Sequence, residues 1–209
     1  QSRLILSVLK PRKSHKESEA VFGDTSKISA FRGLTSNPLI LNRVVEADLI
    51  SYIYGMSSRA LDKTKDARFG SGTCSPDFNL FEDTSSIIKN VAEDLTRIIM
   101  EAVKSEVYIS ESFFNIVGAG GGINPHNHIS DLDKDFGLDL RKKKYALQYY
   151  LSVGDQNCSE PGVLKLYEPV EDILPCKGMI TIISASRAHS AVYDGKTDRV
   201  MIGVNFYSM

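Results

Sequence analysis

The sequence changes character at residues 107–117, which read VYISESFFNIV. This stretch is rich in β-branched and aromatic residues, as expected of a strand, and similar runs follow it up to the C-terminus. They cover residues 144–153, 162–167, 179–183, 190–193 and 200–207. Polar or glycine-containing breaks separate the runs. So many short strands predict an antiparallel sheet system, and we expect a mainly β fold closed as a double-stranded β-helix, or jelly roll.

Two amphipathic helices are predicted before the β-rich part. In residues 42–60 and 84–103 apolar side chains recur at the spacing of a helix. These side chains are Val45, Leu49, Ile53 and Met56 in the first segment, and Ile88, Val91, Leu95, Ile98, Ile99 and Ala102 in the second. We expect both helices to pack on one side of the sheet system. Further upstream, residues 3–9 predict a buried strand and residues 11–32 a loop or mobile arm.

Length and composition indicate one globular domain over residues 1–209. Residues 1–104 would supply a strand, loops and flanking helices, and residues 105–209 the jelly-roll core. Hydrophobic residues make up 42% of the chain, which is enough for a core. Lys and Arg number 25 against 26 Asp and Glu, so the formal charge is −1. The sequence therefore predicts neither nucleic-acid binding nor attraction to an anionic membrane.

The apolar runs and the cysteines predict a cytoplasmic location. The N-terminal apolar run at residues 4–9 is too short for a signal-peptide core, and no segment approaches the ~20 apolar residues of a membrane span. Cys74, Cys158 and Cys176 are odd in number and lack CxxC spacing, which argues against a disulfide framework or a zinc knuckle.

Residues 124–128, which read NPHNH, hold two of the four histidines of the chain. On an extended segment His126 and His128 project to the same side. His189 lies 61 residues beyond His128, where an antiparallel barrel can return it to the pair. Neutral imidazole is the commonest protein ligand for Fe, Zn, Cu and Ni, so a metal site is predicted. The alternative is that each is a surface or a hydrogen-bonded histidine. The glycine-rich residues 118–122 are interpreted as a flexible turn into this strand.

Arg199 opens the last predicted strand, ten residues after His189. With period two, Arg199, Met201, Gly203 and Asn205 share one face. An inward-facing Arg needs an anion, because a buried guanidinium is costly, and its planar fork suits a carboxylate. The alternative is an Arg that faces water at the edge of the sheet.

An ordered set of short motifs resembles the 2-oxoglutarate/Fe(II)-dependent oxygenases. The set comprises Pro125-His126-Asn127-His128, Gln148-Tyr149-Tyr150-Leu151, His189-Ser190, and Arg199 before Ile202-Gly203-Val204-Asn205-Phe206. Within the superfamily the chain is most similar to the branch with a Pro-His-x-His segment, a Tyr-Tyr-Leu strand and an Arg-x-x-x-x-x-Asn ending. The resemblance covers residues 107–209 and is specific through the order of the motifs.

The resemblance implies roles for particular residues. In the superfamily Fe(II) is held by a His-x-Asp/Glu pair and a distal His, which leaves positions for 2-oxoglutarate and O₂. Here His126 matches the first ligand and His189 the distal one. Arg199 matches the residue that pairs with the distal carboxylate of 2-oxoglutarate. Further candidates for cosubstrate binding are Tyr150, Gln148, Asn115 and Asn205.

His128 departs from the superfamily pattern, because it occupies the position of the carboxylate ligand. Three interpretations stay open: a three-histidine site with His128 as a ligand, a two-histidine site completed by water, or a carboxylate recruited from Asp131 or Asp133. We favour His128. The acidic residues 131–139 and the basic residues 141–144 are predicted to form an exposed, mutually screened loop at the mouth of the barrel.

The resemblance implies an enzyme, a dioxygenase (hydroxylase) that uses Fe(II) and takes 2-oxoglutarate as cosubstrate. It would convert 2-oxoglutarate to succinate and CO₂ and hydroxylate a C–H bond of a peptide side chain or a small metabolite. Two alternatives remain: a cupin-like dioxygenase with three histidine ligands that uses no 2-oxoglutarate, and a non-catalytic β-barrel that binds a ligand or a partner protein.

Overall fold

A computed structural model of the chain describes residues 37–59, 73–74, 79–118, 121–135, 140–155, 161–193 and 195–209. The predicted strand at residues 3–9 and the predicted loop at residues 11–32 lie outside the described residues. None of the described helices is long and apolar enough to cross a bilayer.

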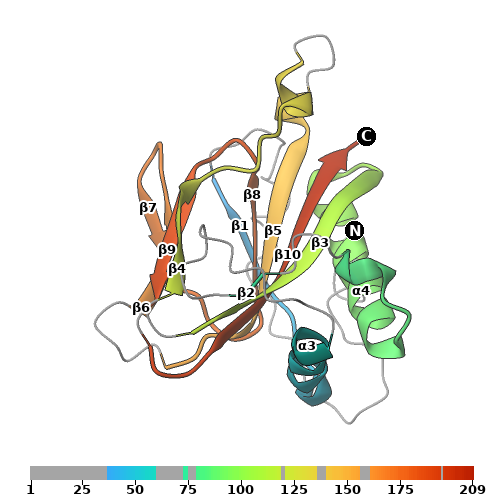
Figure 1. The fold of residues 1–209 in the computed structure, drawn as a ribbon. Helices are drawn as coiled ribbons and strands as arrows, with labels where there is room; N and C mark the ends of the chain where they lie inside the picture. The colour runs from blue at the N-terminus through green and yellow to red at the C-terminus, as the bar shows by residue number, and fades with distance from the viewer. Residues whose placement is uncertain are drawn as a thin grey trace.

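The strands form two antiparallel sheets that face each other, as Figure 1 shows. The larger sheet has the order β1-β8-β5-β10-β3-β2 and the smaller one β4-β9-β6-β7. The larger sheet contains β1 (Leu39–Asn42), β2 (Thr73–Cys74), β3 (Val107–Val117), β5 (Lys144–Ser152), β8 (Met179–Ser184) and β10 (Arg199–Ser208). The smaller sheet contains β4 (Gly121–His126), β6 (Pro161–Leu166), β7 (Glu171–Ile173) and β9 (His189–Tyr193). From β3 onward the chain passes repeatedly between the sheets, which confirms the predicted jelly roll.

Two α-helices cover the outer face of the larger sheet, α3 (Ala47–Arg59) and α4 (Ser86–Val103). Their predicted apolar stripes lie in the main hydrophobic core together with side chains of β1, β3, β5, β8 and β10. The Ser85 side chain caps α4 by accepting a hydrogen bond from the Ile88 N–H at 3.3 Å. Three short 3₁₀ turns complete the described structure: η2 (Leu80–Glu82), η3 (Leu132–Lys134) and η4 (Leu140–Lys142). Both predicted helices are confirmed.

Alternation along the strands of the larger sheet separates its two faces. In β10, Val200, Ile202, Val204 and Phe206 pack into the core beneath the helices. The intervening residues face the smaller sheet and line a cavity, among them Arg199, Met201 and Asn205. β5 follows the same pattern, because Leu147 and Tyr149 join the core while Gln148 and Tyr150 line the cavity. One apolar face therefore holds the fold together, and the other is left for polar side chains.

The glycine-rich segment before the histidines differs from the predicted flexible turn. Gly121 and Gly122 already belong to β4, where they pair with Tyr193 and Val192 of β9. A Cβ on Gly122 would lie 2.5 Å from the carbonyl oxygen of Ala191, so only glycine allows this close approach of the two backbones. The glycines thus let β4 join β9, which the sequence pattern did not predict. The short strands β1, β2 and β7 were also not predicted.

A buried ion pair connects the end of β1 to helix α4. Arg43 donates to Asp94 at 2.9 Å, and both side chains have an exposed fraction of 0%. Arg43 also donates to Glu46 at 2.6 Å and to the hydroxyl of Tyr149 at 3.0 Å. Arg43 therefore lies at the point where β1, α4 and β5 meet.

Replacing Asp94 by Ala should lower the free energy of unfolding by about 3 kcal/mol, because it leaves the buried Arg43 charge with less compensation. Chemical denaturation of the purified protein measures this change. The matched control is Glu93→Ala on the same helix, since Glu93 is 49% exposed and pairs with Arg97 at 3.8 Å. That change should cost less than about 1 kcal/mol. Equal losses in the two variants would contradict a stabilising role for the buried pair.

Candidate metal and cosubstrate site

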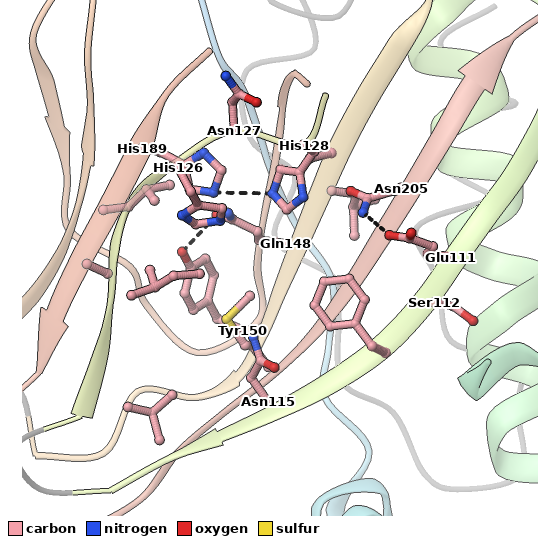
Figure 2. Close-up of a pocket in the computed structure, with 18 of the residues that line it drawn as sticks. Glu111, Ser112, Asn115, His126, Asn127, His128, Gln148, Tyr150, His189 and Asn205 are labelled. Carbon is pink, nitrogen blue, oxygen red and sulfur yellow. Dashed lines mark hydrogen bonds between the residues drawn. The ribbon is translucent and has the colours of Figure 1, made fainter. Parts of the chain in front are cut away.

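A cavity of about 560 Å³ lies between the two sheets. All eight residues that the sequence predicted for the site line this cavity. They are His126, His128, His189, Arg199, Tyr150, Gln148, Asn115 and Asn205. Figure 2 shows the histidines near one another, with Tyr150, Gln148 and Asn115 around them. The fold therefore brings together residues that are up to 90 positions apart in the sequence, Asn115 and Asn205.

The three histidines form a compact cluster across the smaller sheet. His126 ends β4 and His189 begins β9, and their Cα atoms are paired in the register of these strands. His128 follows β4, and its N–H donates to the carbonyl of Ala185 at 2.8 Å. One ring nitrogen from each histidine lies within 4.8 Å of the others, and Nε2 of His128 is 3.4 Å from Nε2 of His189. Within the described part of the chain, this is the group of His, Cys, Asp or Glu side chains that has the geometry to hold a metal ion.

Backbone carbonyls orient two of the imidazole rings. Nδ1 of His126 lies 2.8 Å from the carbonyl oxygen of Asn124, and Nδ1 of His189 lies 3.3 Å from that of Arg187. A carbonyl only accepts, so these contacts favour the tautomer with the proton on Nδ1 and the lone pair on Nε2. Such contacts are the usual means by which proteins orient metal-binding histidines.

Burial favours the neutral form of His189. The side chain is 1% exposed, and burial, together with the charge of His126, lowers the pKa of His189 to about 4 against the ordinary 6.5. The hydrogen bond to the Arg187 carbonyl opposes this shift only in part. At neutral pH His189 is therefore an uncharged imidazole, the form that can donate to a metal ion.

The two candidate carboxylates do not lie in the histidine group. The Asp131 side chain is 98% exposed and pairs with Lys134 at 2.7 Å. Asp133 is fully buried and pairs with Lys144, which is 4% exposed, at 2.8 Å. The predicted exposed charge loop is therefore wrong for Asp133 and Lys144, because the two side chains neutralise each other inside the protein.

Asp133 anchors the segment that carries His128. Its carboxylate accepts hydrogen bonds from the N–H and hydroxyl of Ser130 at 2.7 and 2.6 Å, and from the Tyr207 hydroxyl at 2.7 Å. Burial alone would raise the pKa of Asp133, but the hydrogen bonds from Lys144, Ser130 and Tyr207 outweigh burial and hold the pKa well below its usual value. The carboxylate is thus charged and fully hydrogen-bonded, and it connects the segment after His128 to β5 and β10.

Arg199 also lines the cavity, and its side chain is closely surrounded by other residues. The side chain is 4% exposed, and its Nη1 donates to the carbonyl of Gly162 at 2.7 Å. The guanidinium lies over the rings of Tyr150 and Tyr193, 5.3 and 5.5 Å from their centroids. Gly162 has φ +75°, and a Cβ there would lie 2.2 Å from Nη1, so glycine is required beside the arginine. This buried cation in the cavity wall favours an anionic ligand.

Gln148 and Tyr150 are held by hydrogen bonds on the cavity face of β5. The Gln148 amide oxygen accepts from the hydroxyls of Tyr150 and Thr181, each at 3.1 Å. These two bonds turn the NH₂ group of Gln148 away from the hydroxyls. Burial raises the pKa of Tyr150 to about 12, so its hydroxyl stays protonated. The side-chain oxygen of Asn115 on the adjoining wall is buried and accepts no hydrogen bond from the described residues.

Sequence reasoning missed several residues of the cavity wall. Glu111 and Phe113 share the cavity face of β3 with Asn115, and the period-two alternation from Asn115 could have identified both. Phe113 lies over Gly203, where a Cβ would come within 2.3 Å of its ring. Tyr193 carried no comparable signal, because its position beside Arg199 depends on how β9 pairs with β4 and β6.

Comparison with solved structures finds similar folds in structures of prolyl hydroxylases and of a 2-oxoglutarate-bound enzyme. A prolyl-4-hydroxylase from Pseudomonas putida has a TM-score of 0.62 and 15% identity, over 88% of this chain and 98% of that chain. HygX from Streptomyces hygroscopicus, solved with nickel and 2-oxoglutarate bound, has a TM-score of 0.64 and 14% identity, over 91% and 88%. A prolyl hydroxylase from Trichoplax adhaerens, in complex with a peptide fragment of the hypoxia inducible factor, has a TM-score of 0.62 and 15% identity, over 83% and 84%.

The chain therefore has the double-stranded β-helix fold of these oxygenases, and the resemblance predicted from the ordered motifs is confirmed at the level of the fold. The sequence matches no protein-family model and no curated protein. At 10 to 15% identity the comparison identifies the architecture, and the chemistry has to be argued from the cavity itself.

Replacing Asp133 by Asn should lower the free energy of unfolding by about 3 kcal/mol, because it leaves the buried charge of Lys144 without its counterion. Chemical denaturation measures the loss. The stabilisation by a carboxylate with a lowered pKa is present above its unfolded pKa, near 3.8, and disappears as the pH falls below that value. The difference between wild type and Asp133→Asn should therefore be full at pH 7 and shrink in acid.

The matched control is Asp131→Asn, two residues away and almost fully exposed. It should change the unfolding free energy by less than about 1 kcal/mol at any pH. A large effect of Asp131→Asn, or none of Asp133→Asn, would contradict the anchoring role.

Proposed function

We propose that this protein is an Fe(II)- and 2-oxoglutarate-dependent oxygenase that hydroxylates a C–H bond of its substrate. The observation that carries the proposal is the presence, in one cavity of an oxygenase fold, of a three-imidazole cluster and a buried arginine. A metal site alone fits many enzymes, and a buried arginine alone fits any anion. Together they provide one place for a metal ion and another for a dicarboxylate.

His126, His128 and His189 would hold the metal ion. The donor set fits a borderline divalent metal such as Fe(II), because imidazole nitrogen suits Fe, Zn, Cu and Ni. Two of the rings are oriented with Nε2 as the lone-pair nitrogen, and His189 is kept neutral. When bound, the ion supplies the activation of O₂ that couples oxidation of 2-oxoglutarate, to succinate and CO₂, to hydroxylation of the substrate.

Arg199 would bind the distal carboxylate of 2-oxoglutarate. Its planar fork suits a carboxylate, and the aromatic rings of Tyr150 and Tyr193 restrict its movement. The Tyr150 hydroxyl, the Gln148 amide and the buried Asn115 side chain are further candidates for binding the cosubstrate, since all three line the same cavity. The chain's own task is thus to hold the dicarboxylate in one orientation and to limit access of water to the metal.

His128 also favours a second candidate function, a three-histidine dioxygenase of the cupin type that uses no 2-oxoglutarate. That enzyme would explain a third imidazole directly, but it gives no role to the buried Arg199. The dependence of 2-oxoglutarate binding on Arg199 therefore separates the two candidates.

We propose a peptide side chain or a small metabolite as the substrate class. Of the similar structures, the Trichoplax enzyme is bound to a peptide fragment and HygX has also been solved with hygromycin B. We also propose the cytoplasm as the compartment, because the three cysteines are odd in number and lack CxxC spacing.

Adding 2-oxoglutarate to the Fe(II)-loaded protein without oxygen should produce a weak visible charge-transfer band, because the cosubstrate binds next to the metal. His126→Ala should remove the band by weakening metal binding. Arg199→Met should raise the 2-oxoglutarate concentration that gives half of the band by about tenfold or more, since a charge-assisted contact is lost. Anaerobic absorption titration measures both effects.

The control for the histidine variant is His15→Ala, which removes the one histidine outside residues 126–189. It should leave the band unchanged. A wild-type protein that binds iron but gives no band would favour the dioxygenase without 2-oxoglutarate. A band that is insensitive to Arg199→Met would contradict the role of Arg199 in binding the cosubstrate. Unchanged iron content in His126→Ala would contradict the metal site.

A further inference from the structure

A second polar pair lies on the same cavity face as Arg199, further along the strand. Asn205 of β10 is six residues from Arg199, or ~20 Å along an extended strand. Its Cα partner across the sheet is Glu111 of β3. Both side chains line the cavity that holds the histidines. The cavity therefore has a cation, Arg199, toward one end and a carboxylate, Glu111, toward the other.

A β-bulge lies next to Glu111 in β3. The register of β3 and β10 shifts between Asn205 and Phe206, so that Asn205 pairs with Glu111 but Phe206 pairs with Ile109. Ser110 is the extra residue, and its hydroxyl donates to the Asn205 carbonyl at 3.1 Å. Ser110 lines the cavity together with Glu111, which already faces it through the alternation along β3. Bulges are over-represented next to functional sites.

Asn205 leaves a hydrogen-bond acceptor beside Glu111. Its side-chain NH₂ donates to Oε2 of Glu111 at 2.6 Å. Its side-chain oxygen is buried and accepts no hydrogen bond from any residue that the structure describes, although the residue is only 3% exposed. A buried amide oxygen without a donor costs free energy, so this atom is suited to a ligand that brings an N–H group. In the view of Figure 2 the Asn205 side chain lies between Glu111 and His128.

The charge of Glu111 is not neutralised by the lysine that shares the cavity wall. Lys144 lines the cavity, but its ammonium is bonded to Asp133 at 2.8 Å. In the part of the chain that the structure describes, no Lys, Arg or His forms an ion pair with Glu111. A surface glutamate normally needs no partner. Here, however, the carboxylate is oriented by a buried asparagine whose own oxygen lacks a donor.

We propose that Glu111 and Asn205 form a recognition site for a cationic nitrogen, and that the substrate of this cavity carries an ammonium or guanidinium group. Both groups offer several N–H donors and a positive charge, which match the carboxylate of Glu111 and the amide oxygen of Asn205. Asn205 and Glu111 would hold the charged end while the reacting carbon lies near the histidines. Naming this ligand as the substrate rests on the proposed oxygenase function, whereas the cation site rests on the pair itself.

Two matched pairs of probes test the site by binding alone. The first pair is Nα-acetyl-lysine methylamide and its 6-hydroxynorleucine analogue, and the second is Nα-acetyl-arginine methylamide and its citrulline analogue. Within each pair the probes differ mainly in charge. Isothermal titration calorimetry with the purified full chain should show that at least one charged probe binds about tenfold more tightly than its neutral analogue. Glu111→Gln should reduce this ratio to less than about threefold.

The control is Glu106→Gln, which removes an exposed carboxylate just before β3 that does not line the cavity. It should leave the ratio unchanged. Equal binding of charged and neutral probes, no binding of either charged probe, or a ratio that survives Glu111→Gln would overturn the proposal. Because the assay needs neither iron nor turnover, binding that depends on Glu111 would support the cation site even if the charge-transfer band were absent.

Discussion

The pairing of His126 with His189 across β4 and β9 is the constraint on which the site depends. The two residues are 63 positions apart, and no local motif brings them together. The two histidines come together only if β4 lies against β9. This pairing in turn requires glycine at position 122, because a side chain there would clash with the carbonyl oxygen of Ala191. A change in the register of these strands by one residue would turn the histidines to opposite faces. The position of the proposed metal site is thus a consequence of sheet pairing.

The larger sheet supplies the other polar side chains of the cavity. It can do so because one of its faces packs against the helices and the other lines the cavity. Apolar residues of β3, β5 and β10 pack under α3 and α4, and this core stabilises the sheet independently of the cavity. The opposite face can therefore hold buried polar side chains such as Arg199 and Asn115, whose desolvation costs free energy. The same division explains the buried Asp133–Lys144 pair at the end of β5. That pair fixes the segment after His128 through hydrogen bonds to Ser130 and Tyr207.

Much of the fold and site could be predicted from the sequence. Period 3.6 identified both helices, and short runs rich in β-branched and aromatic residues identified six strands. The ordered motifs, together with Asn115 on its predicted strand, identified eight residues of one cavity. The features that were not predicted depend on contacts between residues that are distant in the sequence. The burial of Asp133 with Lys144 could not be read from a charge-rich segment, because charged residues are usually exposed. Strands as short as β7 carry too few residues for a periodic signal, and the position of Tyr193 follows from sheet register. Glu111, by contrast, was predictable from the alternation along β3.

In the proposed site three imidazoles, and no carboxylate of the chain, hold the metal ion. X-ray absorption spectroscopy of the Fe(II)-loaded protein tests it most directly, because the multiple-scattering signal of imidazole reports how many histidines bind the iron. The proposed site predicts three imidazole ligands in the wild-type protein and two in His128→Ala. Two imidazoles in both proteins would contradict it and would mean that His128 is not a ligand.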